Sequence, residues 1–496
     1  MTSTEEAVRE GFSGRSDGRW LGQSTIWLVA TIGSAVLWSL GTGLHPIPGI
    51  ALLAPLPVLW LAPRQSAPAV YAAAALSWFG GNARYWSYFI GTLEQPATIP
   101  ATLLVGGALT FGACIALFRK LLIQGRSGWA VLALPALWTS AEFLVSMVGG
   151  IGAWWSIAYS QAEVAAIVRV ASITGVWGIS FLLLAVPSAV ATLMAPGIRT
   201  TRALTVVGTA AVAVAVAMGA GQWRSSAASD GPVTRVGLVA LAQPPMYVPV
   251  ATPDGARMIT EAVAAVDQLA EVIVFTEKAW HARQSELWLL RDPLNAVAAR
   301  RGVHVVVGLE LEQPNGTVNA AIAYPGETIY AKRFLVPGLE SSLQPGSASV
   351  RIPGRSWALA ICFDLDRPAL VRQNRTEGAT LILAPALDFT VDHWLHSRMA
   401  VLRAAESGIA IARPAQLGEL VAVDAQGTVK ASVRTDLTET RMALADIRTA
   451  GDRTPYVHWG DWFAGLSIML AVAGGLAAFR RPAAQPRKPR ELVDQS

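Results

Sequence analysis

The chain has 496 residues and a mean hydropathy of +0.42, with 53% hydrophobic and only 15% charged residues. Soluble globular proteins usually carry about a quarter of charged residues, so this composition argues against an ordinary soluble enzyme and indicates a membrane protein. The net charge of +5 would suit a nucleic-acid partner, but the basic residues lie beside apolar segments and form no single cluster. We therefore expect the chain to contact a membrane and no nucleic acid.

The first part of the chain is a succession of long apolar runs. A spanning helix needs about 20 mostly apolar residues. Eight candidate spans approach or meet this length: Ser24–Leu40, Gly49–Ala62, Ala67–Phe89, Pro100–Phe118, Gly128–Met147, Ala166–Met194, Ala203–Ala220 and Trp462–Phe479. The second span is short and contains Pro55 and Pro57, which predicts a kinked or re-entrant segment. The sixth is long, which predicts a tilt or a bend near Pro187.

The basic residues set the expected orientation. Lysine or arginine precedes the first span and follows the second, fourth, sixth and eighth, whereas the connections His45–Gly49 and Val148–Glu163 carry neither. The positive-inside rule therefore places both termini in the cytoplasm. The polar N-terminal stretch is too long for an ordinary cleaved signal peptide, so we expect the first span to be retained.

This alternation predicts the domain organisation of a multi-pass protein of the cell membrane. A transmembrane domain of seven spans covers residues 24–221, and a last transmembrane helix covers residues 462–479. Residues 1–23 form a cytoplasmic N-terminus and residues 480–496 a basic cytoplasmic tail. Residues 222–461 then form a domain on the extracytoplasmic face.

From Thr234 the pattern changes to short apolar runs that are typical of strands. The predicted strands are Arg235–Gln243, Glu271–Phe275, Val303–Leu311, Thr317–Tyr324, Glu327–Leu335, Trp357–Cys362, Ala379–Leu387, Gly408–Arg413 and Leu420–Val423. Helical spacing predicts helices over Ala256–Ala270, Gln284–Arg301 and Trp394–Ser407. Continuous apolar strands indicate sheets covered by helices, so we predict a layered α/β domain.

Three polar residues lie where apolar runs end: Glu277 after EVIVF, Lys332 after ETIYA and Cys362 after WALAI. Side chains at strand ends can converge on one site above a rigid sheet. A carboxylate can take the proton of a thiol, and an ammonium group favours the thiolate and stabilises an oxyanion. An acyl group could then pass to the sulfur and on to an amine or to water. The second cysteine, Cys114, lies in an apolar run and is interpreted as a buried small hydrophobe, with no disulfide to Cys362.

Several segments carry a resemblance to known families. FTEKAW, YAKRFLVPGLE and ICFDL resemble the three catalytic segments of the nitrilase superfamily, in the same order along the chain. The membrane half, including WWSIAYSQ and ASITGVWGISFLLL, is similar to bacterial apolipoprotein N-acyltransferases, and AVLRAAESG resembles the helix that follows the catalytic strands in that family. The resemblance covers nearly the whole chain. It implies a membrane α-helical bundle of about eight spans joined to an extracytoplasmic nitrilase-like αββα sandwich.

The resemblance also implies an activity, an acyltransferase of lipoprotein biosynthesis. Glu277 would be the general base, Lys332 the oxyanion stabiliser and Cys362 the nucleophile. A phospholipid would donate its acyl chain to the sulfur, and the α-amine of a diacylglyceryl-cysteine at an apolipoprotein N-terminus would receive it. Glu340 matches an acidic residue with a supporting role in the family. The reaction needs no metal and no diffusible cofactor.

Some of the family's motifs are altered in this chain. At the first catalytic segment, Phe-Thr-Glu (Phe275–Glu277) replaces the usual Trp-Pro-Glu. After Lys332, Val-Pro-Gly-Leu-Glu replaces Val-Pro-Phe-Gly-Glu. Phe363 and Asp364 replace the Tyr and Glu that usually follow the cysteine, and we expect them to support the site. Ala384–Trp394 replaces an Asn-rich segment.

Three other functions are alternatives to that of an acyltransferase. An amidase-type hydrolase would use the same residues with water, but a soluble amide needs no bilayer. A weak or inactive membrane scaffold that stabilises a partner enzyme would suit the altered motifs, yet it has no use for Glu277, Lys332 and Cys362 together. A transporter needs ionisable residues within its spans, and few, such as Glu142 and Arg169, lie there.

Three histidines are candidate metal ligands: His281, His393 and His396. The last two are three residues apart and would share a helix face. No third ligand stands at a matching spacing, so we interpret all three as surface or core histidines.

Overall fold

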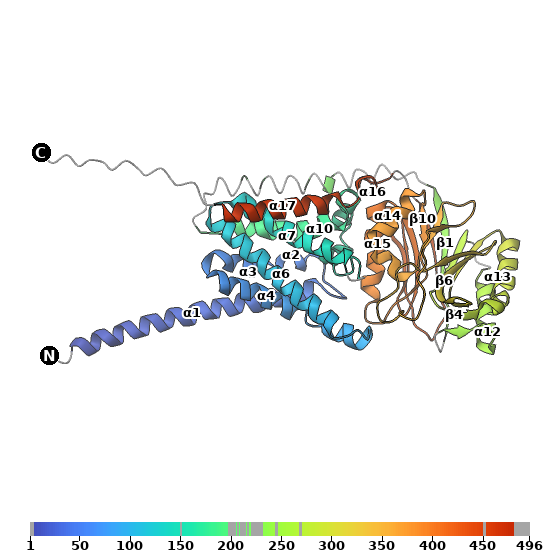
Figure 1. Cartoon of the computed structure of the whole chain (residues 1–496), viewed down its shortest axis with the longest axis horizontal. Coiled ribbons are helices and arrows are strands. Elements are labelled where there is room, and N and C mark those ends of the chain that lie inside the picture. Colours follow the sequence, from blue (N-terminus) through green and yellow to red (C-terminus); the bar gives the residue numbers. More distant parts are fainter. Residues whose placement is uncertain are drawn as a thin grey trace.

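The computed structural model describes residues 4–148, 151–196, 232–243, 247–266, 270–449 and 453–480, with single positions between 205 and 219. Most helices of the membrane half lie on one side of the molecule and the strands on the other (Figure 1). The α-helices before residue 196 are α1 (Thr4–Gly41), α2 (Ile50–Leu53), α3 (Leu56–Leu61), α4 (Ala67–Asn82), α5 (Tyr85–Ser87), α6 (Thr98–Ile123), α7 (Ser127–Met147), α8 (Ala165–Val168), α9 (Ala171–Thr174) and α10 (Val176–Leu193). Two short 3₁₀-helices are η1 (Ala62–Arg64) and η3 (Ile157–Gln161), and η2 (Tyr88–Thr92) is a short π-helix.

Five helices of the described part are long and apolar enough to cross a membrane. They are Gly22–Gly41 within α1, then α6, α7, α10 and α17 (Trp462–Phe479). They confirm a membrane-spanning helical bundle, and they coincide with the first, fourth, fifth, sixth and eighth predicted spans. The seventh predicted span, Ala203–Ala220, lies outside the described residues except for single positions.

Three predicted spans differ in detail from the observed helices. The second is broken into α2, α3 and η1, as the prolines predicted, with Pro55 at the N-cap of α3. The third ends as a regular helix at Asn82 instead of continuing to Phe89. The sixth was wrong in its first third, because Gly175 adopts φ +68° and α10 begins only at Val176. The apolar residues before it form α8 and α9, which contact α15. Helix α15 belongs to the α/β domain within residues 232–449, which is named the outer domain because it lies beyond the ends of the bundle helices (Figure 1).

The outer domain contains two sheets among its described residues. The first has the order β15-β1-β3-β5-β4-β2, with β6 beside β5 and β7 beside β6. Its strands are β1 (Val233–Ala240), β2 (Val248–Pro249), β3 (Val272–Phe275), β4 (Trp280–Arg283), β5 (His304–Gln313), β6 (Gly316–Tyr324), β7 (Thr328–Ala331) and β15 (Arg441–Arg448). The second has the order β14-β13-β12-β10-β9-β8, with β11 beside β12. Its strands are β8 (Val350–Arg351), β9 (Trp357–Leu359), β10 (Leu381–Leu383), β11 (Ala386–Leu387), β12 (Ala410–Gln416), β13 (Glu419–Val423) and β14 (Val429–Arg434).

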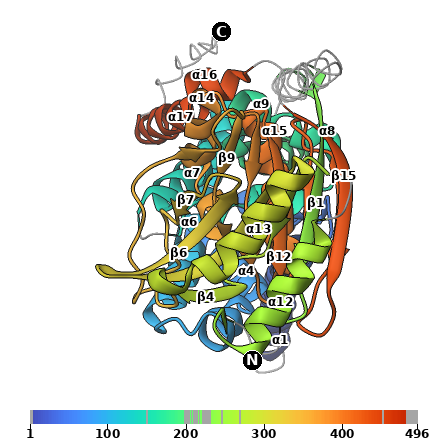
Figure 2. The ribbon, with the colours of Figure 1, turned by 90° about the vertical axis from the view of Figure 1, so that its right-hand side faces the viewer.

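Helices cover both outer faces of this pair of sheets. The helices are α12 (Pro253–Ala265), α13 (Trp288–Arg301), α14 (Pro368–Thr376), α15 (His393–Ser407) and α16 (Pro455–Trp459). Helices α12 and α13 lie over the first sheet on the side away from the membrane half (Figure 2). Helices α14 and α15 lie between the second sheet and the membrane helices (Figure 1). A buried apolar cluster, which includes Val236, Leu359 and Ala412, joins the two sheets. The domain is therefore the predicted αββα sandwich.

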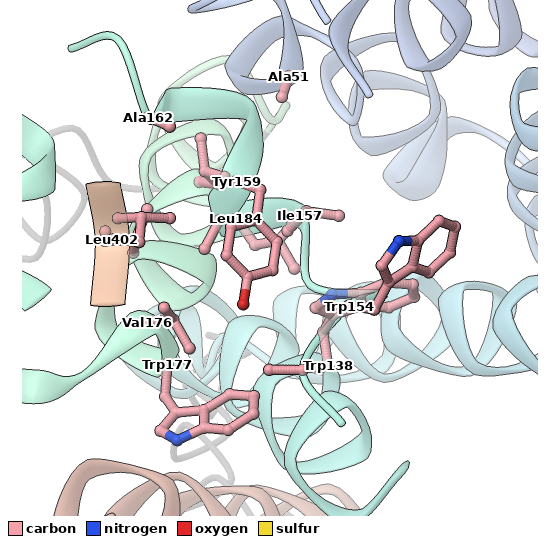
Figure 3. Packing of buried hydrophobic residues seen from close by; sticks show 14 of the residues in the cluster. Ala51, Trp138, Trp154, Ile157, Tyr159, Ala162, Val176, Trp177, Leu184 and Leu402 are labelled. Carbon is pink, nitrogen blue, oxygen red and sulfur yellow. The ribbon is translucent and has the colours of Figure 1, made fainter. Parts of the chain in front are cut away.

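Helix α15 also fixes the outer domain to the membrane half. Leu402 belongs to the same buried cluster as Val176 and Tyr159 (Figure 3). Polar contacts reinforce this packing: Arg403 Nη2 donates to the Tyr159 hydroxyl at 3.0 Å, and the Val176 N–H donates to Glu406 Oε1 at 2.9 Å. Buried polar groups need such partners. The interface is thus packed like a protein interior.

Two predicted strands end earlier than expected, and this affects the site. Strand β7 ends at Ala331 and β9 ends at Leu359, so Lys332 and Cys362 lie in the segments that follow the strands. The short strand β4, helix α14 and the outer strands β14 and β15 were not predicted from the sequence.

Candidate active site

Glu277 lies in a tight turn after β3. Its N–H donates to the carbonyl of Ala386 in the other sheet at 3.2 Å, so the turn joins the two sheets. Gly308 of β5 packs against this turn, because a Cβ at that position would lie 2.6 Å from the Glu277 Cα. Real Cβ atoms do not approach so closely, so glycine is required there for Glu277 to keep its place.

Lys332 lies beside Glu277 in the buried interior. Its Nζ is 2.9 Å from Glu277 Oε1 and 2.9 Å from Glu340 Oε2. Burial disfavours the ammonium group, but the two carboxylates outweigh that effect and hold the pKa of Lys332 well above its ordinary value. Lys332 therefore stays charged, so it can stabilise a negative charge but cannot act as a base.

Glu340, Lys278 and Asn319 complete a buried network around this pair. Glu340 Oε1 is 3.0 Å from Lys278 Nζ. Asn319 Nδ2 donates to Glu277 Oε1 at 2.6 Å and to Glu340 Oε1 at 2.8 Å. Burial disfavours the charged carboxylate of Glu340, but Lys332 and Lys278 outweigh it and lower its pKa to about 2. Two carboxylates and two ammonium groups thus balance each other.

Cys362 is held in a strained turn. It begins the 3₁₀-helix η6 (Cys362–Asp366) with a backbone φ of +43°, a conformation that is uncommon for a residue with a side chain. Such strain costs about 1–3 kcal/mol and is found mainly where structure serves function. The Cys362 N–H donates to the Pro385 carbonyl at 3.0 Å, and Sγ lies 3.6 Å from the Leu387 carbonyl oxygen.

The surroundings of Cys362 favour the protonated thiol in the free protein. Burial and then the nearby Glu277 carboxylate raise its pKa well above the ordinary value, although Lys332 and Arg413 act in the opposite direction. The thiol consequently needs a base. Glu277 Oε1 is held by Asn319 and Lys332, whereas Oε2 is buried with no hydrogen-bond partner among the described residues. This oxygen is available for a proton.

Asp364 fastens the Cys362 turn to the neighbouring segment. It accepts hydrogen bonds from the Tyr330 hydroxyl at 2.7 Å, from the Phe334 N–H at 2.9 Å and from the Ile361 N–H at 2.9 Å. Burial raises its pKa to about 6 in spite of these bonds. Phe363 points elsewhere and lines the pocket described next.

Cys362 lines an apolar pocket between the outer domain and the membrane half. The empty space in the pocket and at its open mouth amounts to about 820 Å³. Its apolar wall includes Phe89, Ile99, Ile151 and Trp154 from the membrane half and Phe363, Leu387 and Met399 from the outer domain. A second, open apolar groove lies between α6 and α7, and Ile99 and Ile151 line both the pocket and the groove. The pocket that holds the Cys362 sulfur and the groove between the membrane helices are therefore neighbours with a shared wall.

Sequence reasoning missed Asn319, Lys278 and Gly308. Signals for them were present: Asn319 interrupts an apolar strand, Lys278 is adjacent to Glu277, and Gly308 interrupts a run of valines. His393 and His396 form ion pairs with acids, His393 Nδ1 at 3.0 Å from Glu419 and His396 Nδ1 at 3.3 Å from Asp392, and His281 lies in strand β4. Within the described ranges, no three His, Cys, Asp or Glu side chains are grouped to hold a metal ion.

Comparisons with known proteins cover both halves of the chain. Residues 34–189 match the family model described as the apolipoprotein N-acyltransferase N-terminal domain. The apolipoprotein N-acyltransferase of Pasteurella multocida is 25% identical in an alignment that covers 76% of this chain and 82% of that protein. The chain is similar to the apolipoprotein N-acyltransferases over most of its length. The resemblance expected from the sequence motifs is thereby confirmed.

A further relative and a solved structure add to this comparison. The apolipoprotein N-acyltransferase of Vibrio vulnificus is 24% identical in an alignment that covers 71% of this chain and 75% of that protein. A solved variant of the amidase from Nesterenkonia sp. AN1 is 20% identical, with a TM-score of 0.39, and covers 49% of this chain and 98% of that chain.

Proposed function

We propose that the chain is an apolipoprotein N-acyltransferase that moves an acyl chain from a phospholipid to the α-amine of a diacylglyceryl-cysteine. One observation carries this proposal: Cys362 lines an apolar pocket whose wall is built partly by membrane helices, and the buried Glu277–Lys332 pair acts on the charge of its thiol. Relatives that cover most of the chain bear the name of this activity. A soluble amidase would not require a pocket whose wall is formed by membrane helices.

In the first half-reaction, Cys362 takes the acyl chain. Glu277 Oε2 accepts the thiol proton as the sulfur attacks the ester carbonyl of the phospholipid. Lys332 stabilises the negative charge on the carbonyl oxygen. The ester C–O bond then breaks, Glu277 returns the proton to the leaving alcohol, and a thioester remains on Cys362. Glu340 and Asn319 hold Glu277 and Lys332 in place.

In the second half-reaction, the acceptor amine attacks the thioester carbonyl. The carbon–nitrogen bond forms, the carbon–sulfur bond breaks, and a proton of the amine passes through Glu277 to the Cys362 thiolate. The apolar pocket and the neighbouring groove, which share Ile99 and Ile151 in their walls, suit the acyl chains of both the phospholipid and the diacylglyceryl acceptor. We place the site on the extracytoplasmic face with both termini in the cytoplasm, because the basic residues of the connections require that orientation.

The direct test is to trap the thioester. Purified full-length protein in detergent is incubated with a phospholipid that carries a labelled acyl chain, and the label is located by intact mass and peptide mapping. We expect the label on Cys362, sensitive to neutral hydroxylamine and absent from Cys362→Ala. Cys114→Ala, which removes the cysteine buried in α6, serves as the control and should be labelled like wild type. Equal labelling of wild type and Cys362→Ala would overturn the proposal and favour a scaffold.

Lys332→Met is expected to slow labelling of Cys362 about 10²–10³-fold, the usual effect of removing one donor to an oxyanion. Lys278→Met is a matched control, because both lysines contact Glu340 but only Lys332 contacts Glu277. We expect less than about a tenfold loss for Lys278→Met. Equal losses in the two variants would show that the network needs only its positive charge and not a donor at the position of Lys332.

A further inference from the structure

One carboxylate of the Cys362 pocket has no role in the steps above. Asp366 is the last residue of η6, is 2% exposed and lines the same pocket as Cys362. Its Oδ2 is buried and has no hydrogen-bond partner among the described residues. Buried carboxylate oxygens are normally paired, because leaving one unpaired is unfavourable. The free oxygen therefore indicates a place for a donor from the substrate.

The membrane half holds the backbone of Asp366. The Ala153 N–H donates to the Asp366 carbonyl at 2.8 Å. Gly152, at φ +61°, packs so closely that a Cβ there would collide with the same carbonyl oxygen. The connection between α7 and η3 thus fixes the end of η6, and the side chain of Asp366 is placed where the outer domain meets the membrane half.

Several charged or titratable groups face this carboxylate from the elements packed around it. The cationic ones are His396 and Arg403 of α15, Arg413 of β12 and the neighbouring Arg367, and the phenols are Tyr88 of η2 and Tyr159 of η3. Burial opposes the charged form more strongly than these cations favour it, so the pKa of Asp366 rises to about 7. A carboxylate of this kind can exchange a proton near neutral pH.

The two cations that most favour the charged form of Asp366 are already engaged with other acids. Arg413 forms a two-bond pair with Asp388, at 2.9 and 2.5 Å. His396 Nδ1 lies 3.3 Å from Asp392. In contrast, no side-chain hydrogen bond or ion pair to Asp366 is found in the described part of the chain. Its negative charge therefore remains available to a cation that enters the pocket.

We propose that Asp366 binds the α-ammonium group of the acceptor and accepts one of its protons. This inference rests on the proposed function and names the residue that recognises the acceptor. In a 3₁₀-helix with a rise of about 2 Å per residue, the Cα atoms of Cys362 and Asp366 are roughly 8 Å apart. An attacking nitrogen about 3–3.5 Å from the thioester carbonyl and about 3 Å from a carboxylate oxygen fits between the two side chains.

Each proton of the second half-reaction then has a donor and an acceptor. One ammonium N–H bond breaks and its proton goes to Asp366, which leaves a neutral amine. The amine nitrogen bonds to the thioester carbonyl carbon, and the carbon–sulfur bond breaks. The second proton of the amine passes through Glu277 to the Cys362 thiolate, and the products are an amide and a thiol. Asp366 afterwards releases its proton to solvent.

The test separates the two half-reactions in the full-length protein. Asp366→Asn keeps the shape of the side chain and removes its charge. We expect Cys362 to acquire the labelled acyl chain within about threefold of the wild-type rate, and transfer to a diacylglyceryl-cysteine peptide to fall about 10²-fold or more. Neutral hydroxylamine, which carries no ammonium group near pH 7, should cleave the thioester of both proteins equally fast. Asp366→Glu, which retains a carboxylate, should recover part of the transfer.

Asp364→Asn is the matched control, because Asp364 is a buried acid two residues away whose oxygens are paired and which does not line the pocket. It should slow both half-reactions together. Transfer to the peptide at the wild-type rate in Asp366→Asn would overturn the inference, and so would a parallel loss of both half-reactions, as in Asp364→Asn. A wild-type protein that forms no thioester would instead overturn the proposed function.

Discussion

Replacing Glu277 by glutamine is expected to slow acylation of Cys362 about 10²–10⁴-fold, the range usual for the loss of a general base. The amide keeps the size of the side chain and can still accept a hydrogen bond from Lys332. It cannot accept the thiol proton, which the free Oε2 of Glu277 is placed to do. The measurement is the initial rate of labelling by a phospholipid with a labelled acyl chain.

The raised pKa of the Cys362 thiol also predicts how the rate of this variant depends on pH. In Glu277→Gln the effect of the Glu277 charge on the thiol is removed, but burial, the larger cause, remains. The thiolate should therefore stay rare, and raising the pH to about 9 should not restore the rate. Glu340→Gln is the control: it also neutralises a carboxylate beside Lys332 but leaves Glu277 intact, and we expect about a tenfold loss. A rate in Glu277→Gln close to that of wild type would exclude Glu277 as the base.

The sequence was sufficient to predict the main elements because their signals are local. Apolar length predicts a span, and short β-branched runs predict buried strands. Glu277, Lys332 and Cys362 could be chosen because each follows such a run. The broken sixth span shows the limit of this reasoning: the residues before Gly175 are apolar because they pack beneath the outer domain, which composition cannot distinguish from contact with lipid.

The remainder of the site depends on contacts between distant segments. Asn319 bridges Glu277 and Glu340 only because β6 pairs with β5 in the observed register. Asp366 is separated from Gly152 by more than two hundred positions, and no periodicity in either segment indicates that they touch. The two sheets also meet at Glu277 through a backbone hydrogen bond to Ala386, which depends on no side chain. Such contacts are fixed by the tertiary fold.

Asp388→Ala is expected to destabilise the protein by about 3–5 kcal/mol, because it leaves the Arg413 guanidinium buried without its partner. Asp388 is fully buried and Arg413 is 2% exposed, and the pair lies at the edge of the Cys362 pocket. The measurement is thermal unfolding in detergent, with a fall in the midpoint on the order of 10 °C. Asp446→Ala removes a similar two-bond pair with Arg235 that is exposed to solvent, and it should have little effect.

A double variant identifies the cause of that loss. If the unpaired charge of Arg413 is responsible, then replacing it by methionine in the Asp388→Ala background should restore most of the stability, because an apolar side chain of similar length suits the buried site. If lost packing around Asp388 is responsible, the double variant should be less stable than Asp388→Ala alone. The first result would mean that the buried pair is not required for stability as such. Its retention beside Cys362 would then reflect the electrostatic demands of the pocket, where Arg413 favours the thiolate that Glu277 opposes.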